Sequence, residues 1–252
     1  MKVLGIIPAR YDSSRFPGKP LVVIDGKTMI RRVYEQAKSC RQLDRVVVAT
    51  DHEAILKHVK MSGGEAVMTS RHHTSGTERC NEAAGLLEAS GERFDAIVNI
   101  QGDEPFIDPR QIAQVVSCLE DPAHEIATLV RATSSWDEIR SENVVKVVVD
   151  HSGKALLFSR AVIPFVRGKT PEQWPGEVTF YKHVGIYGYR TGVLNRIVGL
   201  PMTALEKAES LEQLRWLEYG YTIYTQVTEF ESTAIDTPGD LLKITNTGGT
   251  KT

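Results

Sequence analysis

Three basic side chains follow the first apolar run of this sequence within ten positions. Arg10, Arg15 and Lys19 come directly after residues 3–7, and Ser14 adds a hydroxyl group beside them. Guanidinium groups bind pairs of phosphate oxygens, and a lysine adds a point charge. Because the whole chain has a net charge of −2, this local group of cations predicts a polyphosphate site rather than a general affinity for nucleic acid or membranes.

An aspartate follows the apolar run at residues 96–100. Asp103 lies in the segment Gln-Gly-Asp-Glu-Pro, where Gly102 permits a tight turn and Gln101 offers an amide that could bind a cytosine edge or a substrate hydroxyl. Mg²⁺ is usually held by one or two carboxylates together with phosphate oxygens and waters. Asp103 is therefore a candidate magnesium ligand, although an aspartate after a strand can also cap a helix.

A second carboxylate occurs in the segment Ile-Asp-Thr-Pro-Gly-Asp-Leu at residues 235–241. Asp236 is a candidate metal ligand, but Asp236 or Thr237 could instead cap a helix that begins at Pro238. We expect Asp240, one turn further on, to stabilise the N-terminus of that helix.

The elements that must position these residues alternate in the first half of the chain. Apolar runs alternate with segments of helical spacing, which predicts right-handed βαβ units and a mostly parallel sheet. In such sheets, ligands bind beyond the carboxyl ends of the strands, where the basic loop and Asp103 fall. The predicted strands are residues 3–7, 45–49, 65–68 and 96–100, and the predicted helices are residues 28–39, 53–62 and 77–89.

The pattern changes beyond residue 120. Strand-like runs occur at residues 125–132, 144–149, 154–159 and 184–189, with few helices between them until residues 211–218. The segment 167–178 is rich in Gly and Pro and is expected to be an exposed loop. A mixed sheet with an inserted β-rich segment fits this pattern, and the Thr/Gly-rich residues 245–252 are expected to form a disordered tail.

Composition excludes several classes of protein. The 252 residues are 41% hydrophobic and 25% charged, as in an ordinary globular protein. Cys40, Cys80 and Cys118 are too few and too widely spaced for a disulfide framework or a zinc site, and each falls in a predicted helix. With neither a signal peptide nor an apolar stretch of membrane-spanning length, the chain is expected to be cytoplasmic and not membrane-bound.

The loop at residues 8–21 reads P-A-R-x-x-S-x-R-x-P-G-K-P-L, which is neither a Walker A loop nor a dinucleotide-binding loop. It resembles the opening motif of the CMP-3-deoxy-manno-octulosonate synthetases, and the resemblance extends over about residues 2–244. The acidic segments match that family's metal-binding blocks. Further matching blocks are H-x-S-G-T-E-R at residues 73–79, F-S-R-x-x-I-P at 158–164, H-x-G-I-Y-G-Y at 183–189 and E-x-L-E-Q-L-R at 209–215.

The resemblance implies an α/β fold of the three-layer, Rossmann-like GT-A nucleotidyltransferase type. Its mixed central sheet would carry a β-rich segment for sugar binding and dimerisation. The domain would cover residues 1–244, with a CTP-binding half at about 1–120, the sugar-binding and dimerisation part at about 121–233, and a return to the metal site at 234–244. The implied state is a homodimer.

The implied reaction is the transfer of CMP from CTP to 3-deoxy-D-manno-octulosonate, which activates that sugar for lipopolysaccharide biosynthesis. Mg²⁺ is the implied cofactor, held by Asp103 and Asp236. The implied catalytic residues are Arg10, Lys19, Asp103 and Asp236. The implied nucleotide-binding residues are Ala9, Arg10, Ser14, Arg15, Lys19, Ser75, Gly76, Thr77, Arg79 and Gln101, and the implied sugar-binding residues are Gln101, Arg160, Arg167, His183, Tyr187, Glu212 and Gln213.

Three alternatives stay open on the sequence. The acceptor could be an 8-amino-8-deoxy relative of the octulosonate or a sialic acid, or the chain could be a nucleotide-binding regulator without catalytic activity. Glu78 departs from the Asp that is usual in the family's H-x-S-G-T-D-R block, so we leave it out of the expected site. Taken alone, His183 in a strand and the Glu212–Gln213 pair on a helix also have structural interpretations.

Overall fold

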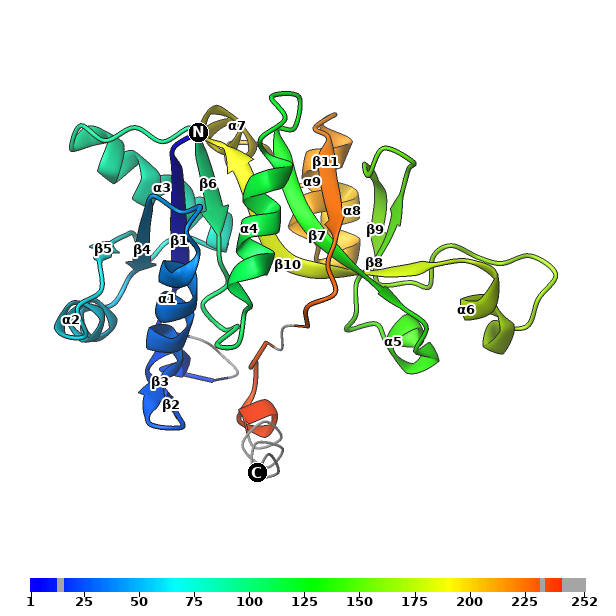
Figure 1. Ribbon diagram of the computed structural model, residues 1–252, viewed down its shortest axis with the longest axis horizontal. Coiled ribbons are helices and arrows are strands. Elements are labelled where there is room, and N and C mark those ends of the chain that lie inside the picture. The colour runs from blue at the N-terminus through cyan, green and yellow to red at the C-terminus, as the bar shows by residue number, and fades with distance from the viewer. Residues whose placement is uncertain (13–15, 232–233, 242–252) are drawn as a thin grey trace. The chain divides into compact units, whose positions relative to one another are not determined.

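The N-terminal apolar runs form four parallel strands in the computed structural model, which describes residues 1–12, 16–231 and 234–241 (Figure 1). The chain divides into two units. Met1–Ala113 and the C-terminal stretch from Glu231 make the first, and Gln114–Phe230 makes the second. In the first unit, β1 (Val3–Ala9) pairs in parallel with β4 (Arg45–Thr50) and β6 (Ala96–Asn99), and β4 pairs in parallel with β5 (Ala66–Met68).

Helices connect these strands as the alternating pattern predicts. α1 (Met29–Ser39) buries Met29, Ile30, Val33 and Ala37, the apolar positions whose spacing indicated a helix. Nearly every residue of β1, β4 and β6 is buried, which accounts for their non-alternating apolar sequences. α2 (Glu53–Met61) and α3 (Gly76–Ala89) also connect these strands, and α4 (Pro109–Cys118) follows β6.

A short hairpin lies between the basic loop and α1. The 3₁₀ turn η1 (Lys19–Leu21) is followed by β2 (Val23–Ile24) and β3 (Lys27–Thr28), which pair antiparallel. Asp25 and Gly26 connect them with φ angles of 43° and 78°. Asp-Gly is a favoured sequence for a two-residue hairpin turn because both central residues need positive φ.

The second unit contains a mixed sheet, as the sequence predicts. β7 (Ile126–Thr133) pairs antiparallel with β10 (Phe180–Arg190) and parallel with β11 (Ile223–Val227). β8 (Lys146–Val149) pairs antiparallel with β10 and with β9 (Ala155–Ser159). β10 is longer than the predicted strand at residues 184–189, and its register against β7 shifts between Val184 and Tyr187.

The expectation of few helices before residue 211 is wrong. Besides α9 (Glu212–Glu218), the second unit contains α5 (Trp136–Arg140), α6 (Trp174–Glu177), α7 (Thr191–Ile197) and α8 (Ala204–Glu209). Each of these helices has four to seven residues. Such lengths are too short to show the repeated apolar spacing by which helices are recognised.

The expectation of a loop at residues 167–178 is wrong from Pro171 on, although most of these residues are exposed as expected. Pro171 begins the 3₁₀ turn η2 (Pro171–Gln173), and Pro175 lies in the first turn of α6, where a missing N–H costs nothing. The indole of Trp174 is only 7% exposed and packs in a cluster with Ile139 and Phe180. The segment thus forms helical turns that begin with proline and pack through Trp174.

The three cysteines are buried thiols. Cys80 and Cys118 lie in helices, but Cys40 follows the last residue of α1, so its predicted helical position is wrong. Burial raises the pKa of Cys40 and raises that of Cys118 to about 11, which keeps both in the unreactive thiol form. Within the described part of the chain, no helix has the length and apolar character needed to cross a membrane.

Candidate active site

A pocket of about 230 Å³ lies in the first unit at the carboxyl ends of its parallel strands. Its walls come from the end of β1, from η1, from the start of α3, from the turn after β6 and from the C-terminal stretch. The expected site residues Ala9, Arg10, Lys19, Ser75, Gly76, Arg79, Gln101, Asp103 and Asp236 all line it. Ser14 and Arg15 lie outside the described residues.

Lys19 contacts both candidate metal ligands. Its Nζ donates to Oδ2 of Asp103 at 2.8 Å and to Oδ1 of Asp236 at 3.2 Å. The lysine side chain is 13% exposed, while the two carboxylates are 28% and 43% exposed. The two aspartates, far apart in sequence, therefore direct oxygen atoms toward one positively charged point that is still open to the pocket.

Main-chain contacts hold the two acidic segments in place. The amide of Ile235 donates to the carbonyl oxygen of Asp103 at 2.9 Å. A Cβ on Gly102 would approach the carbonyl oxygen of Pro8 to 2.6 Å, so only glycine permits this turn to lie against the end of β1. Ile235 is fully buried with Ile24 and Met29. The positions of Asp103 and Asp236 thus depend on packing and main-chain bonds.

Two neighbours of Asp236, not Asp236 itself, cap the helix that begins at Pro238. The hydroxyl of Thr237 accepts from the amide of Asp240 at 3.3 Å, and the carboxylate of Asp240 accepts from the amide of Thr237 at 3.0 Å. This reciprocal pair caps the helical turn that begins at Pro238. Asp240 has the structural role that the sequence suggested, and the side chain of Asp236 is directed to Lys19 instead.

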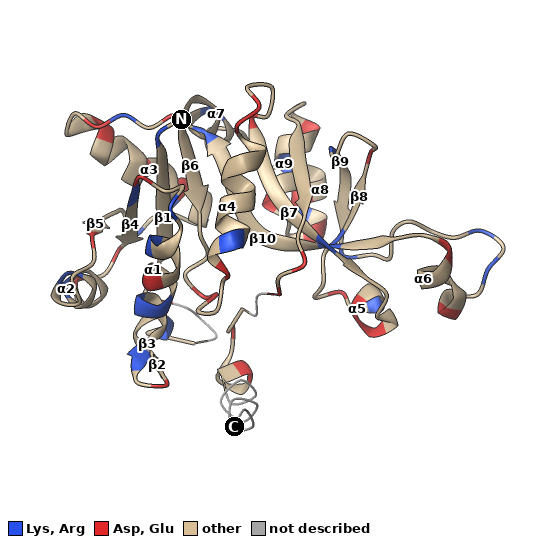
Figure 2. Ribbon diagram, viewed as in Figure 1, with Lys and Arg blue, Asp and Glu red and all other residues tan. Residues whose placement is uncertain are grey.

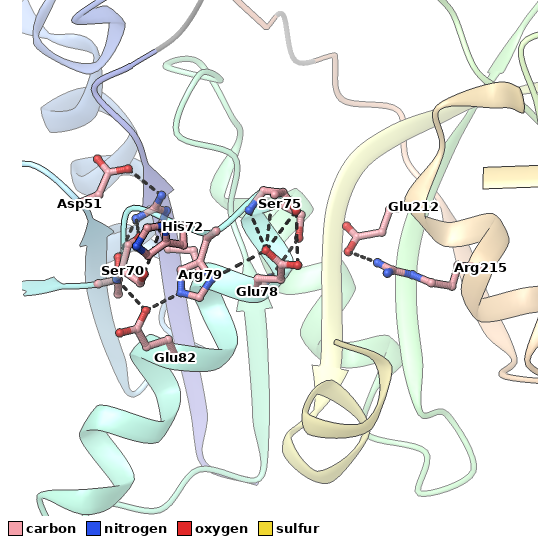
Figure 3. Close-up of polar contacts among 12 residues, drawn as sticks. Asp51, Ser70, His72, Ser75, Glu78, Arg79, Glu82, Glu212 and Arg215 are labelled. Carbon is pink, nitrogen blue, oxygen red and sulfur yellow. Dashed lines mark hydrogen bonds and ion pairs between the residues drawn. The ribbon is translucent and has the colours of Figure 1, made fainter. Parts of the chain in front are cut away.

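The start of α3 forms another wall. Ser75 accepts from the amide of Glu78 at 3.2 Å, and Glu78 accepts from the amides of Thr74 at 2.7 Å and Ser75 at 3.4 Å (Figure 3). Burial acts to raise the pKa of Glu78, but these N–H donors outweigh it and hold the pKa below its usual value. Glu78 is thus a helix cap, which supports leaving it out of the site. Thr77 is buried at 3% exposure and does not line the pocket.

Arg79 lines the pocket, but its guanidinium is already bound by protein groups. It donates to Oδ2 of Asp51 at 2.8 Å, to the hydroxyl of Thr69 at 2.7 Å and to the carbonyl oxygen of Ser70 at 3.2 Å (Figure 3). The residue is only 3% exposed. This arrangement favours a supporting role for Arg79 over a free phosphate ligand. Sequence reasoning missed Asp51, whose only signal was a charged residue directly after an apolar strand.

In the second unit, Arg160 is held by main-chain oxygens. Its Nε donates to the carbonyl oxygen of Glu209 at 2.7 Å, and one terminal nitrogen donates to that of Glu142 at 3.0 Å. The fully buried ammonium of Lys146 donates to three carbonyl oxygens, including that of Arg160 at 2.6 Å. Burial lowers the pKa of Lys146, and the positive charge of Arg160 lowers it further.

His183 and Tyr187 lie on one strand with their ring centroids 5.2 Å apart. Nε2 of His183 lies 3.0 Å from the hydroxyl of Thr128, which itself donates to the carbonyl oxygen of Ile186 at 2.7 Å. Burial lowers the pKa of His183 to about 4, so the ring is neutral near pH 7. Burial, followed by the negative charge of Glu212, raises the pKa of Tyr187 well above its usual value.

The remaining expected sugar residues differ in exposure. Glu212 accepts from a terminal nitrogen of Arg215 at 2.9 Å (Figure 3), and Gln213 is buried at 5% exposure. Arg167 is exposed. His183, Tyr187 and Glu212 therefore gather in one region of the second unit, whereas Arg160 is bound to the end of α8 and Arg167 lies on the surface.

The donor set suits a magnesium ion supported by substrate phosphates. Among residues 1–12, 16–231 and 234–241, no three His, Cys, Asp or Glu side chains gather as a protein-only metal cage. Two carboxylates beside a pocket match the way in which Mg²⁺ is commonly held, with phosphates completing the shell. Lysine and arginine side chains elsewhere are mixed with acidic ones along the chain (Figure 2), so local charge in this pocket matters more than net charge.

Comparisons with known proteins identify relatives of this chain. A family model described as cytidylyltransferase matches residues 4–224. The 3-deoxy-manno-octulosonate cytidylyltransferase of Parabacteroides distasonis is 53% identical over 247 residues and 96% of each chain is covered. That of Bacteroides thetaiotaomicron is 52% identical over 244 residues, again with 96% of each chain covered.

A solved structure of CMP:2-keto-3-deoxy-manno-octonic acid synthetase in complex with CTP matches with a TM-score of 0.90 and 40% identity, covering 99% of both chains. The 4-diphosphocytidyl-2C-methyl-D-erythritol synthase of Anaerococcus prevotii matches with a TM-score of 0.61 and 10% identity, with 98% of both chains covered. The second match shows the shared fold alone, that of an α/β nucleotidyltransferase.

Proposed function

The chain belongs to the 3-deoxy-manno-octulosonate cytidylyltransferase family, and from this premise we propose that it converts CTP and 3-deoxy-D-manno-octulosonate to CMP-3-deoxy-D-manno-octulosonate and pyrophosphate. The product is an activated sugar for lipopolysaccharide biosynthesis. The observation that carries the proposal is the meeting of Lys19, Asp103 and Asp236 in a pocket that Arg10 also lines. Loss of these groups would be expected in a nucleotide-binding regulator without catalytic activity.

In the proposed reaction, the anomeric 2-hydroxyl oxygen of the sugar forms a bond to the α-phosphorus of CTP. The bond from that phosphorus to the oxygen bridging to the β-phosphorus breaks, pyrophosphate leaves with the electron pair, and the hydroxyl proton passes to solvent. Arg10 and Lys19 bind phosphate oxygens and stabilise the charge that develops on the leaving group. The chain needs no covalent intermediate, because positioning and charge neutralisation lower the barrier.

Magnesium is proposed as the cofactor, with Asp103 and Asp236 as its protein ligands. Bound there, it would neutralise phosphate charge and lower the pKa of an attacking hydroxyl. Charge balance supports this assignment. Among the described residues, the pocket is lined by three cationic residues, Arg10, Lys19 and Arg79, and by two carboxylates. The one positive charge in excess is offset by Asp51, which pairs with Arg79, so these groups alone do not balance a triphosphate.

The sugar acid is proposed to bind residues of the second unit. A guanidinium, that of Arg160 or of Arg167, suits the sugar carboxylate, since guanidinium–carboxylate pairs form two parallel hydrogen bonds. Neutral His183, whose Nε2 lies against the hydroxyl of Thr128, is proposed to bind a sugar hydroxyl group through Nδ1. Tyr187, Glu212 and Gln213 complete the proposed set.

We further propose that the enzyme is a cytoplasmic homodimer.

The test is pyrophosphate release from CTP and Mg²⁺ with each of three acceptors: the octulosonate, its 8-amino-8-deoxy relative and a sialic acid. We expect release that depends on acceptor, with the largest kcat/KM for the octulosonate. A larger kcat/KM for either other sugar would reassign the acceptor. Tight CTP binding without turnover of any of the three would favour the regulator.

A further inference from the structure

The residue after Arg10 is held by two consecutive residues at the end of β4. The amide of Tyr11 donates to Oδ1 of Asp51 at 3.3 Å. The ring of Tyr11 stacks on that of His52, with centroids 3.9 Å apart and planes 15° apart. His52 is itself fixed, because its Nδ1 accepts from the amide of Ala54 at 3.2 Å at the start of α2. The main chain and the side chain of Tyr11 are thus both anchored on one strand end.

The other oxygen of Asp51 is bound by Arg79. The distance between the terminal nitrogen and Oδ2 is 2.8 Å, and the two side chains are 4% and 13% exposed. Since Thr69 and Ser70 take further N–H groups of the same guanidinium, the arginine cannot turn away without losing several bonds. A largely buried ion pair of this kind fixes geometry, because removing either partner leaves a charge without compensation.

Tyr11 also determines where the basic loop ends. Its carbonyl oxygen accepts from the amide of Gly18 at 3.0 Å, and Gly18 has a φ of 69° that favours glycine. Arg10 therefore precedes the anchored residue directly, and Lys19 follows the residue that closes the loop on it. A displacement of Tyr11 would move both phosphate-binding cations at once.

We propose that Asp51 is a positioning residue for nucleotide binding. It does not line the pocket, and it acts through Tyr11 on Arg10 and Lys19. By its ion pair with Arg79 it also connects these cations to α3, whose first residues line the same pocket. Asp51 thereby sets the spacing between the phosphate-binding cations and the start of α3. The inference rests on the proposed function for the identity of the nucleotide as CTP.

Two substitutions of Asp51 separate the loss of its charge from the loss of the oxygen that accepts from the amide of Tyr11. Asp51→Asn keeps an oxygen for the amide of Tyr11 but removes the charge facing Arg79, and Asp51→Ala removes both. We expect the Kd and KM for CTP to rise in the order wild type, Asn, Ala, by about tenfold or more for Ala. The KM for the sugar should stay within twofold. Unchanged CTP affinity in both variants would overturn the proposal.

Glu65→Gln is the matched control for loss of a carboxylate in the same unit. Glu65 accepts from Nε of Arg45 at 2.8 Å, away from the pocket. The Glu65→Gln variant should lower thermal stability without changing the Kd for CTP. An equal rise in the Kd for CTP in this variant would show that the effect at Asp51 comes from a general loss of stability. That result would contradict the proposal.

Tyr11→Leu keeps the hydrogen bond from the main-chain amide of residue 11 to Asp51 and removes the stacking on His52. It therefore tests the same anchor even if Asp51 variants fold poorly. A weaker CTP affinity with wild-type sugar KM supports the proposal, and unchanged affinity contradicts it. CTP titration without sugar separates the two claims. If wild type binds CTP but modifies no sugar, the proposed function fails while the comparison of CTP affinities still decides the role of Asp51.

Discussion

The amide of Ile235 donates to the carbonyl oxygen of Asp103 at 2.9 Å, which ties the C-terminal stretch to the turn after β6 without using either carboxylate. The side chains of Asp103 and Asp236 take no part in this main-chain bond, and both contact Lys19. A substitution of either carboxylate should consequently change chemistry more than folding.

Asp103→Asn tests this separation. The variant keeps shape and removes charge, so Mg²⁺-dependent turnover should fall about 100-fold or more, on the order of 3 kcal/mol. CTP binding without metal, measured by calorimetry, should change little, and the Tm should be close to that of wild type. Asp25→Asn, at an exposed ion pair with Arg32, is the control and should retain full activity. Turnover of Asp103→Asn within threefold of wild type would remove Asp103 from the ligand set.

Lys19→Ala should weaken CTP binding and lower turnover, because it removes the ammonium group that contacts both carboxylates and is proposed to bind phosphate oxygens. Thermal stability should change little, since the side chain lies at the pocket surface and not in the core. Lys27→Ala, which removes an exposed lysine bound to Glu35 at 2.6 Å, is the matched control and should bind CTP normally. A Lys19→Ala variant that unfolds readily but is fully active when folded would make Lys19 structural.

Arg160→Lys keeps the charge and loses the planar guanidinium. Losing a charge-assisted hydrogen bond costs roughly 1.5–3 kcal/mol, or about 10–150-fold in kcat/KM for the sugar. The KM for CTP should move far less. Steady-state kinetics with each substrate varied in turn gives both values. Equal damage to both would place Arg160 near the phosphates, and no damage would leave it with its main-chain partners alone.

His183 should make stability depend on pH. Burial lowers its folded-state pKa from 6.5 to about 4, so the unfolded chain binds more protons between these values and stability falls as pH drops from 6.5 toward 4. Wild type should lose on the order of 1–2 kcal/mol more than His183→Gln between pH 7.5 and 5. Urea unfolding at both pH values measures the difference. Equal losses in the two proteins would show that His183 does not carry this dependence.

Much of the first unit could be predicted because its strands and helices are long enough to show their periods. The expected fold class and the family are confirmed by the comparisons. The basic loop and the turn at Asp103 also carry residue types that predicted a phosphate and metal site, and residues of both line one pocket.

The rest could not be predicted for specific physical reasons. Trp174 packs against Ile139, far from it in sequence, in a segment whose Gly and Pro content indicated a loop. The helix α8 does have a sequence signal, since Thr203 and Glu206 form a capping box, but six residues show no period. Asp51 acts through bonds to Tyr11 and Arg79, far apart in sequence, which no local pattern reveals.

In the proposed reaction, CMP passes from CTP to the anomeric oxygen of the sugar. ³¹P NMR of the reaction with Mg²⁺ and octulosonate labelled with ¹⁸O at the anomeric hydroxyl tests this transfer. We expect one new phosphodiester resonance, equal in amount to pyrophosphate and shifted by the isotope, and no reaction without sugar. Formation of free CMP in place of the diester, a diester that lacks the label, or unchanged CTP would contradict it.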